Sequence, residues 1–267
     1  MNLSTHLIAT DASVFRLIED HLISDLVVTA VIIPSNRLGY YKIEVLQSEA
    51  AKRGIPVFTH VLGGKINGRI PPADFAVSWM YSQIIKADDL KLYSKGTLNM
   101  HGGKIPEYRG ASVLQWAIIN GEKELGVTWH SMVGAVDAGE IYAEGRIPIL
   151  PDSDAWDIRQ LMIEEGVRLF PEALTNILSN RVVRVPVLSN GRVWHARKPA
   201  DGYIFPGLTE RELKDLVRAL CPPWPRAFIY SDEGAVSIES VSENWCEGAV
   251  PYMTADGKFL YLLKGSG

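Results

Sequence analysis

Short apolar runs alternate with amphipathic stretches along the first half of the chain. Runs rich in β-branched and aromatic residues predict five short strands, at residues 6–9, 27–33, 55–58, 75–79 and 97–100. Apolar residues at helical spacing predict two helices between them, over 13–23 and 41–53, and Gly54 follows as a cap of the second. Strands that alternate with helices favour an α/β fold, a Rossmann-like, mostly parallel sheet with helices on both faces.

The middle of the chain continues this pattern with longer elements. A helix, two strands and a long amphipathic helix are predicted there, over residues 113–120, 127–131, 141–149 and 154–178. Pro171 lies inside the long helix, where proline removes a backbone hydrogen bond and favours a kink. Beyond this helix the pattern changes, so we expect one catalytic domain over residues 1–180.

The last third of the chain has short segments separated by turn signals. Residues 182–194 predict a hairpin around the turn sequence at 189–191. Residues 209–212 form a capping box at the start of a short helix, and residues 228–263 alternate as an antiparallel sheet does. The sequence therefore predicts a small C-terminal α+β/β-hairpin subdomain over residues 181–267.

Charge and cysteine content narrow the class of protein. The 267 residues are 47% hydrophobic and carry a net charge of −4, which is typical of a soluble globular protein and unlike a dedicated nucleic-acid binder. Cys221 and Cys246 match no zinc spacing, so we expect no metal and two reduced, buried thiols. The N-terminus lacks a basic segment followed by a long apolar one, which favours a cytoplasmic protein without a membrane span.

Candidate chemistry gathers where predicted strands end. Asn99 and His101 are two residues apart, so their side chains point the same way on an extended chain. The amide can donate to a developing oxyanion, and the imidazole can accept a proton near neutral pH. Asp137, in a loop of small residues, is placed to orient an imidazole. Together they suit acyl transfer through a tetrahedral intermediate, with the nucleophile supplied by the substrate.

Each of these residues also has a structural interpretation. A lone Asn at the end of a strand is more often a turn or cap residue, and a lone His is usually structural. Asp137 precedes Ala-Gly and fits a turn, and His130 fits the core better than the site. It is the ordered combination that indicates a catalytic site.

Four spaced motifs carry a resemblance to a known family. They are Asn99-x-His101, Pro106-x-Tyr108-Arg109-Gly110, Gly126-Val127-Thr128-x-His130 and Asp137-x-Gly139-Glu140-Ile141. In this order they resemble the folate-dependent formyltransferases, over about residues 70–178. The family includes enzymes that act on methionyl-tRNA, on glycinamide ribonucleotide and on nucleotide-linked amino sugars. The resemblance implies an enzyme with 10-formyltetrahydrofolate as co-substrate and with Asn99, His101 and Asp137 as catalytic residues.

The same resemblance implies where the pteridine of the folate binds. The pteridine is expected to bind largely through backbone groups of two segments. The first is Gln83, Ile84 and Ile85, and the second is Val133, Gly134, Ala135 and Val136. This chain departs from the family in having Gly-Lys-Ile-Pro at 103–106, where many members have Ser-Leu-Leu-Pro. Ala111 replaces the arginine of the aminoarabinose-pathway member, which argues against that sugar. No Gly-x-Gly-x-x-Gly fingerprint follows the first strand, so no nicotinamide cofactor is expected.

The acceptor is inferred from the C-terminal third. A basic loop there resembles the corresponding segment of amino-sugar N-formyltransferases, and its Arg197 and Lys198 are candidates for binding a diphosphate, with two solvated charges as the alternative. Arg109 is a candidate for binding phosphate, with pairing to a nearby carboxylate as the alternative. The acceptor we expect is a dideoxy amino sugar on dTDP or GDP, destined for O-antigen or another lipopolysaccharide component. Methionyl-tRNA, glycinamide ribonucleotide, a formate-releasing hydrolase and a non-catalytic folate-binding module remain alternatives. A homodimer through the C-terminal sheet also remains open.

Overall fold

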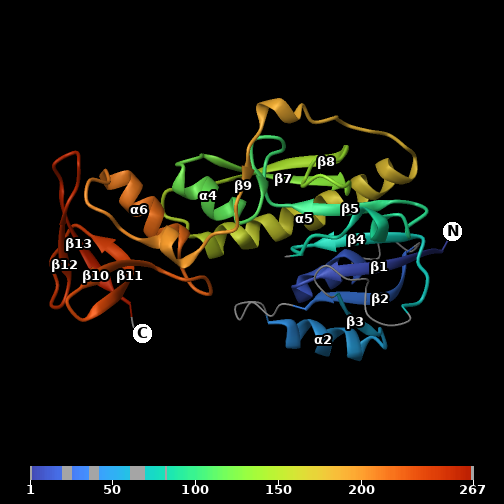
Figure 1. Cartoon of the computed structure of the whole chain (residues 1–267), viewed down its shortest axis with the longest axis horizontal. Coiled ribbons are helices and arrows are strands. Elements are labelled where there is room, and N and C mark those ends of the chain that lie inside the picture. The colour runs from blue at the N-terminus through green and yellow to red at the C-terminus, as the bar shows by residue number, and fades with distance from the viewer. Residues whose placement is uncertain (1, 20–25, 36–41, 61–69, 82, 266–267) are drawn as a thin grey trace. The chain divides into compact units, whose positions relative to one another are not determined.

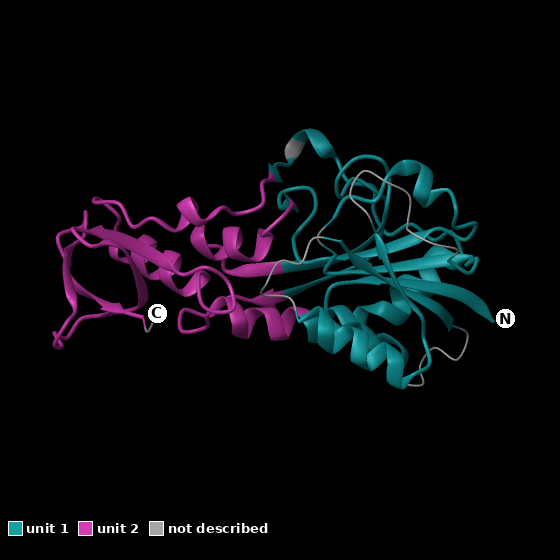
Figure 2. Cartoon of the chain, turned by 60° about the horizontal axis from the view of Figure 1, so that its bottom comes forward, with its two compact units in different colours: residues 1–109, 126–146, 163–193 teal, residues 110–125, 147–162, 194–267 magenta. Residues whose placement is uncertain are grey.

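The computed structural model describes residues 2–19, 26–35, 42–60, 70–81 and 83–265, and the chain divides into two compact units. Unit 1 consists of residues 1–109, 126–146 and 163–193, and unit 2 of residues 110–125, 147–162 and 194–267 (Figure 2). The expected division of the chain into a catalytic domain over residues 1–180 and a subdomain over residues 181–267 stays a prediction.

Unit 1 is built on a seven-stranded sheet, drawn in Figure 1 in the order β3-β2-β1-β4-β5-β7-β8. In that order the strands are Val57–His60, Leu26–Pro34, Leu3–Ala9, Phe75–Trp79, Thr97–His101, Glu124–Ser131 and Ile141–Pro148. The five strands from β3 to β5 pair in parallel, and β7 pairs antiparallel to β5. The predicted α/β fold with a mostly parallel sheet is therefore confirmed.

The sheet centre is apolar on both faces because helices cover it. Leu7, Val31 and Val77 of the central strands are 0% exposed. On β7, Trp129 packs against Phe170 of the long helix α5, with ring centroids 5.0 Å apart. Its indole nitrogen donates to the carbonyl oxygen of Gly166 in the same helix. Burial on both sides explains why these strands read as continuous apolar runs in the sequence.

The helices follow the predicted periodicity with shifted ends. In chain order α1 to α6 are Arg16–Glu19, Ile43–Lys52, Ala87–Leu90, Val113–Ile119, Ala155–Leu178 and Glu210–Ala219. The helix expected over 13–23 begins as the 3-10 turn η1 (Ala12–Phe15) and continues as α1, while residues 20–23 lie outside the described part of the chain. Helix α5 runs through Pro171 as expected.

Unit 2 contains α4, α6 and a four-stranded antiparallel sheet in the order β10-β11-β13-β12. Its strands, from β10 to β13 along the chain, are Ala227–Ser231, Gly234–Ser242, Val250–Met253 and Phe259–Lys264. Helix α6 packs against both α4 and β11, and the predicted capping box is present because Thr209 and Glu212 exchange hydrogen bonds. The C-terminal antiparallel sheet is confirmed.

The hairpin predicted over 182–194 is wrong. The turn sequence forms the 3-10 turn η2 (Leu188–Asn190), and the two flanking segments pair elsewhere. The backbone N–H of Val183 donates to the carbonyl of Ile141, and β9 (Val193–Trp194) pairs with β6 (Arg109–Gly110). Tertiary partners therefore override a local turn preference.

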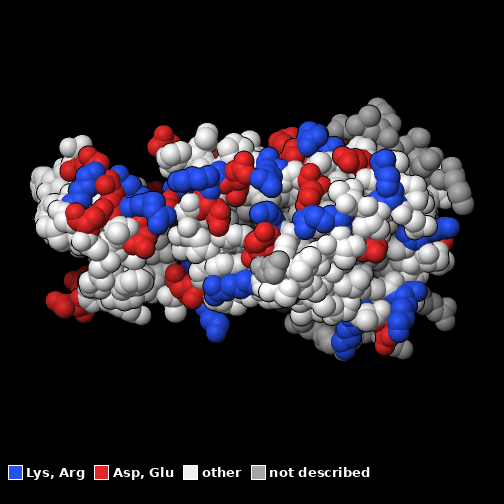
Figure 3. Space-filling view, turned by 90° about the horizontal axis from the view of Figure 1, so that it is seen from above, with Lys and Arg blue, Asp and Glu red and all other residues white. Residues whose placement is uncertain are grey.

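The surface drawn in Figure 3 carries acidic and basic side chains close together rather than one continuous charged face. Within the described residues, no helix combines the length and the apolar character that crossing a membrane requires. Cys246 is exposed and Cys221 is partly exposed, so the expectation of two buried thiols is wrong.

Candidate active site

Strands β5 and β7 bring the predicted residues together. Asn99 and His101 lie at the carboxyl end of β5, and the antiparallel register sets Asn99 opposite His130 and His101 opposite Thr128. Residues directly opposite each other in such a pair have neighbouring side chains on the same face of the sheet. The register therefore places His130 beside the predicted Asn99–His101 pair.

Asp137 reaches the same place from a turn after β7. Its backbone has φ of +43°, a left-handed conformation that aspartate tolerates better than most residues. One carboxylate oxygen is 3.5 Å from Nδ1 of His101, and the other is 3.4 Å from Nε2 of His130. Asp137 thus lies between the two imidazoles. The structure brings all three predicted catalytic residues together and adds His130 to them.

The hydrogen bonds of His130 fix the direction of the Asn99 amide. Nδ1 of His130 is 2.8 Å from the carbonyl oxygen of Ser131, so Nδ1 carries the hydrogen and donates. In the neutral imidazole Nε2 is then an acceptor, and Nδ2 of Asn99, 3.1 Å away, donates to it. The His130 side chain is 2% exposed, which leaves this tautomer without competition from bulk water. Asn99 keeps a second amide hydrogen for another acceptor.

His101 is held by the backbone of the loop that follows it. Its Nε2 lies 2.5 Å from the carbonyl oxygen of Tyr108, a contact in which the imidazole must donate. Its Nδ1 faces Asp137, and the side chain is 7% exposed. A protonated His101 would therefore have an acceptor on each side. Among the described residues, no three His, Cys, Asp or Glu side chains are arranged to hold a metal ion.

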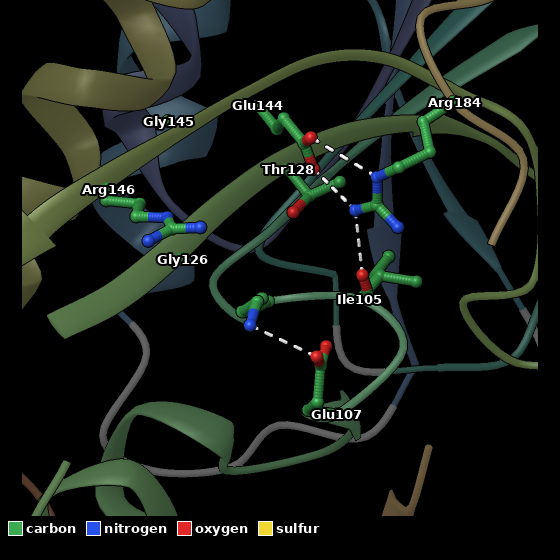
Figure 4. Close-up of a pocket in the computed structure, with 9 residues that line it drawn as sticks. Ile105, Glu107, Gly126, Thr128, Glu144, Gly145, Arg146 and Arg184 are labelled. Carbon is green, nitrogen blue, oxygen red and sulfur yellow. Dashed lines mark hydrogen bonds and ion pairs between the residues drawn. The ribbon is translucent and has the colours of Figure 1, made fainter. Parts of the chain in front are cut away.

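The loop from 102 to 109 is braced from the side of β7 and β8. The Thr128 hydroxyl donates to the carbonyl of Gly103 over 2.9 Å, and Arg184 donates to the carbonyl of Ile105 over 2.8 Å. Figure 4 shows Arg184 also paired with Glu144, and both residues line a cavity of about 180 Å³. None of the three predicted catalytic residues lines this cavity. Its walls instead fix the loop whose Tyr108 carbonyl holds His101.

The two segments expected to bind the pteridine are partly apolar and partly exposed. Ile84, Val133 and Val136 expose 73%, 46% and 40% of their surface. Gln83 is buried and hydrogen-bonded to Ser35 through both its amide oxygen and its amide nitrogen. This arrangement leaves apolar surface, as a flat aromatic ring requires.

The other residues of these segments contribute differently. Gly134 and Ala135 are exposed in the turn before Asp137. Ile85 points into a buried cluster with Ile8 and Ile32, so only its backbone is available to a ligand. Trp79 belongs to the core, because it is 0% exposed.

The predicted anion-binding residues lie in different units. Arg109 belongs to unit 1, and Arg197 and Lys198 belong to unit 2. The Nε atoms of Arg109 and Arg197 are buried and find no hydrogen-bond acceptor among the described residues. Burial lowers the pKa of the Arg197 guanidinium, and nearby Asp201 opposes that shift. Lys198 is exposed. Two buried guanidinium nitrogens thus have unused donor capacity.

A family model described as formyl transferase matches residues 68–174 of this chain. The matched segment contains Asn99, His101, His130 and Asp137, the residues that meet at β5 and β7. The resemblance seen in the sequence motifs is thereby confirmed, and so is the prediction of an enzyme of the formyltransferase class.

Solved structures with the same fold include enzymes of three specificities. A 4-N formyltransferase from Francisella tularensis has 19% identity and a TM-score of 0.72, covering 89% of this chain and 98% of its own. An N-formyltransferase from Helicobacter canadensis, in complex with folinic acid and dTDP-3-aminofucose, has 18% identity and a TM-score of 0.70, with coverages of 99% and 100%. Methionyl-tRNA formyltransferase from Clostridium thermocellum has 16% identity and a TM-score of 0.60, with coverages of 98% and 100%. At these identities the likeness establishes the fold.

Proposed function

We propose that this protein is an N-formyltransferase that moves a formyl group from 10-formyltetrahydrofolate to the amine of a nucleotide-linked amino sugar. The observation that carries the proposal is the meeting of Asn99, His101 and Asp137 at the carboxyl end of β5, within the segment that matches the family model. Ligands of open α/β sheets bind at this edge.

Asn99 has the geometry of an oxyanion donor. One of its amide hydrogens is committed to His130, which holds the amide plane, and the second is available to an oxygen that gains negative charge. A donor that is fixed before the reaction costs no reorganisation when the charge appears. The folate supplies the formyl carbon as the electrophile.

His101 is the proton acceptor in this proposal. With Nε2 donating to the Tyr108 carbonyl, Nδ1 is the nitrogen that takes the proton of the attacking amine. The resulting cation lies between the Tyr108 carbonyl and the Asp137 carboxylate. Asp137 therefore orients the imidazole and balances its charge, without taking up the proton itself. His101 then passes this proton to the folate nitrogen as the bond between that nitrogen and the formyl carbon breaks.

The folate is assigned to the segments around Ile84 and Val133–Val136. Their exposed aliphatic side chains fit the faces of a pteridine, and the turn presents backbone groups to its polar edge. The complex of the H. canadensis enzyme with folinic acid supports a folate co-substrate for the fold.

The acceptor is assigned more narrowly to a dTDP- or GDP-linked dideoxy amino sugar. Arg197 and Lys198 in unit 2 are the proposed diphosphate ligands, Arg109 in unit 1 is proposed by itself as a phosphate ligand, and the buried Nε of each arginine supplies a donor. The enzyme solved with dTDP-3-aminofucose has a TM-score of 0.70, against 0.60 for methionyl-tRNA formyltransferase. Both match nearly the full length of this chain, so length does not separate the two acceptors. A cytoplasmic enzyme of this kind would supply formylated sugars for surface polysaccharide such as O-antigen.

The test is to incubate the protein with 10-formyltetrahydrofolate and a panel of dTDP- and GDP-linked 3-amino and 4-amino sugars. We expect mass spectrometry to show one of them gaining a formyl group. Consumption of the folate without any amine would instead indicate a hydrolase, and formylation of methionyl-tRNA alone would overturn the sugar assignment.

Variants test the assigned roles. We expect Asn99→Ala to lower turnover by about 10²–10³-fold and His101→Ala by about 10²–10⁴-fold. Asn244→Ala, on an exposed asparagine of unit 2, is the control and should leave turnover unchanged. Wild-type turnover in the Asn99 or the His101 variant, with the fold intact by circular dichroism, would refute the assignment.

A further inference from the structure

Unit 2 holds a group of aromatic side chains that is not part of its core. Trp116 and Trp194 are stacked, with ring centroids 5.4 Å apart and planes 29° from parallel. His195 meets Trp116 at 5.0 Å with its ring tilted by 60°. Both indoles are half-buried, whereas the paired Trp79 and Trp129 of unit 1 are 0% exposed. The stack therefore leaves part of its aromatic surface to solvent.

The backbone around the stack is fixed by close packing. The Ala111 N–H donates to the carbonyl of Trp194, and the indole N–H of Trp116 donates to the carbonyl of His195. Gly110 adopts φ of +98°, and a Cβ there would collide with the Trp194 carbonyl oxygen. The Arg197 N–H donates to the Ser112 hydroxyl. Residues 194–197 are thus held against residues 110–112 of the same unit, so the stack is preorganised.

A cationic group with unused donors follows two residues after His195. The Nε of Arg197 is buried and has no acceptor within the described chain. An unsatisfied buried donor costs about 1–3 kcal/mol, so a ligand oxygen at this position would recover free energy. Lys198 is next in sequence and exposed. Aromatic surface and a buried guanidinium nitrogen without an acceptor lie within five consecutive residues.

We propose that the Trp116–Trp194 stack is the platform on which the planar base of the nucleotide carrier stacks, with Arg197 binding the adjoining diphosphate. This inference rests on the proposed function and specifies where the nucleotide is recognised. Stacking on an aromatic face suits any base, because each has a π-face. Another tryptophan pair of unit 2, Trp156 with Trp224, already has the Arg159 guanidinium 5.2 Å over the Trp156 ring.

The test measures binding of dTDP, GDP and inorganic pyrophosphate to the full chain by calorimetry. We expect Trp194→Ala to lower the affinity for both nucleotides by about 5–150-fold and to leave the affinity for pyrophosphate unchanged. Trp194→Phe should keep most of the nucleotide affinity, and Trp194→Leu should lose it, because leucine fills space without a π-face. Arg197→Ala should weaken all three ligands. Trp245→Ala, at a 67% exposed indole, is the matched control and should bind as wild type.

Each outcome separates this inference from the wider proposal. Equal nucleotide affinity in wild type and Trp194→Leu, both folded, overturns the platform but leaves formyl transfer standing. Nucleotide binding that follows the predicted order, without formylation of any sugar, supports the platform and overturns the proposed function. Failure of the wild type to bind either nucleotide overturns the platform, and with it the nucleotide-linked acceptor.

Discussion

A single buried imidazole decides which way the candidate oxyanion donor points. In its neutral form with the hydrogen on Nδ1, His130 donates to a main-chain carbonyl and accepts through Nε2 from the amide of Asn99, while an Asp137 oxygen lies 3.4 Å from the same Nε2. An asparagine amide that rotates by half a turn would present oxygen instead of N–H. His130 is therefore a positioning residue, which acts on the reaction through Asn99.

His130→Ala should lower kcat by about 10–100-fold, since misplacing a catalytic group by about 1 Å costs roughly 10²-fold. The KM for the folate should stay unchanged, because His130 lies outside the two proposed folate segments. His130→Gln should recover part of the loss through its side-chain oxygen. Steady-state kinetics of the three proteins checks this, and equal kcat in the alanine and glutamine variants would mean that the ring serves packing alone.

Gly103 leaves room for His101 to reach the Tyr108 carbonyl. A Cβ at this position would lie 2.7 Å from Nε2 of His101 and would overlap the Tyr108 oxygen. Gly103→Ala should therefore push the imidazole from its place and lower kcat by at least about tenfold, with destabilisation of about 1–3 kcal/mol from overpacking. Lys104→Ala, at the next and exposed residue of the loop, is the control. Normal turnover in the Gly103 variant would show that His101 works without the Tyr108 contact.

At the scale of single residues, the sequence predicted the side chains proposed as catalytic but not the groups that hold them. Asn99, His101 and Asp137 stand out by their motif spacing, and the structure brings them together. His130 was assigned to the core, because its contact with Asn99 depends on β5 and β7 being antiparallel neighbours. The role of the Tyr108 carbonyl was not predicted, because a backbone acceptor cannot be recognised from the pattern of side chains in the sequence.

At the scale of elements, the agreement is best where burial and periodicity coincide. The strand at 75–79 has the predicted bounds, because all five residues are buried in the sheet. The hairpin at 182–194 failed because its pairing partners, Ile141 and Arg109–Gly110, are distant in sequence. The helix α6 succeeded because its start is encoded locally, in the capping box of Thr209 and Glu212.

That capping box predicts a pH dependence of stability. The Thr209 backbone N–H and hydroxyl hold the pKa of the Glu212 carboxyl below its ordinary value. Because the pKa of Glu212 is lower in the folded protein than in the unfolded chain, its ionised carboxylate stabilises the fold. This stabilisation is fully present above the ordinary pKa of about 4.5 and is lost as the pH falls through the lowered pKa of the folded state. Glu212→Gln keeps an acceptor without the charge. Its melting temperature should lie below that of wild type at pH 7, and the difference should shrink below about pH 4.5.

Melting curves between pH 7 and pH 3 measure this difference. Glu247→Gln, at an exposed carboxylate of the same unit, is the control for loss of one negative charge. A difference between wild type and Glu212→Gln that stays constant across this range would show that the carboxylate charge does not stabilise the start of α6.

At the scale of the whole molecule, charge separates the proposed acceptor from a nucleic acid. The chain carries 27 Lys and Arg against 31 Asp and Glu, and Figure 3 shows both signs intermixed on the face that it draws. A protein that neutralises 6–10 phosphates loses about 10³–10⁵ in affinity between 50 and 200 mM salt. On the same scale, two or three phosphate charges of a nucleotide sugar lose at most roughly 10–40-fold.

The formyl-transfer reaction should therefore lose no more than roughly 10–40-fold over this salt range, and bulk tRNA should not compete with the sugar substrate. The measurement is kcat/KM for the accepted nucleotide sugar at 50 and 200 mM NaCl, with and without micromolar tRNA. Arg197→Ala should flatten the remaining salt dependence, because it removes one of the proposed phosphate contacts. Inhibition by submicromolar tRNA together with a steep salt dependence would mean that the protein has a nucleic-acid-binding surface despite its net negative charge. Methionyl-tRNA would then be the acceptor to test next.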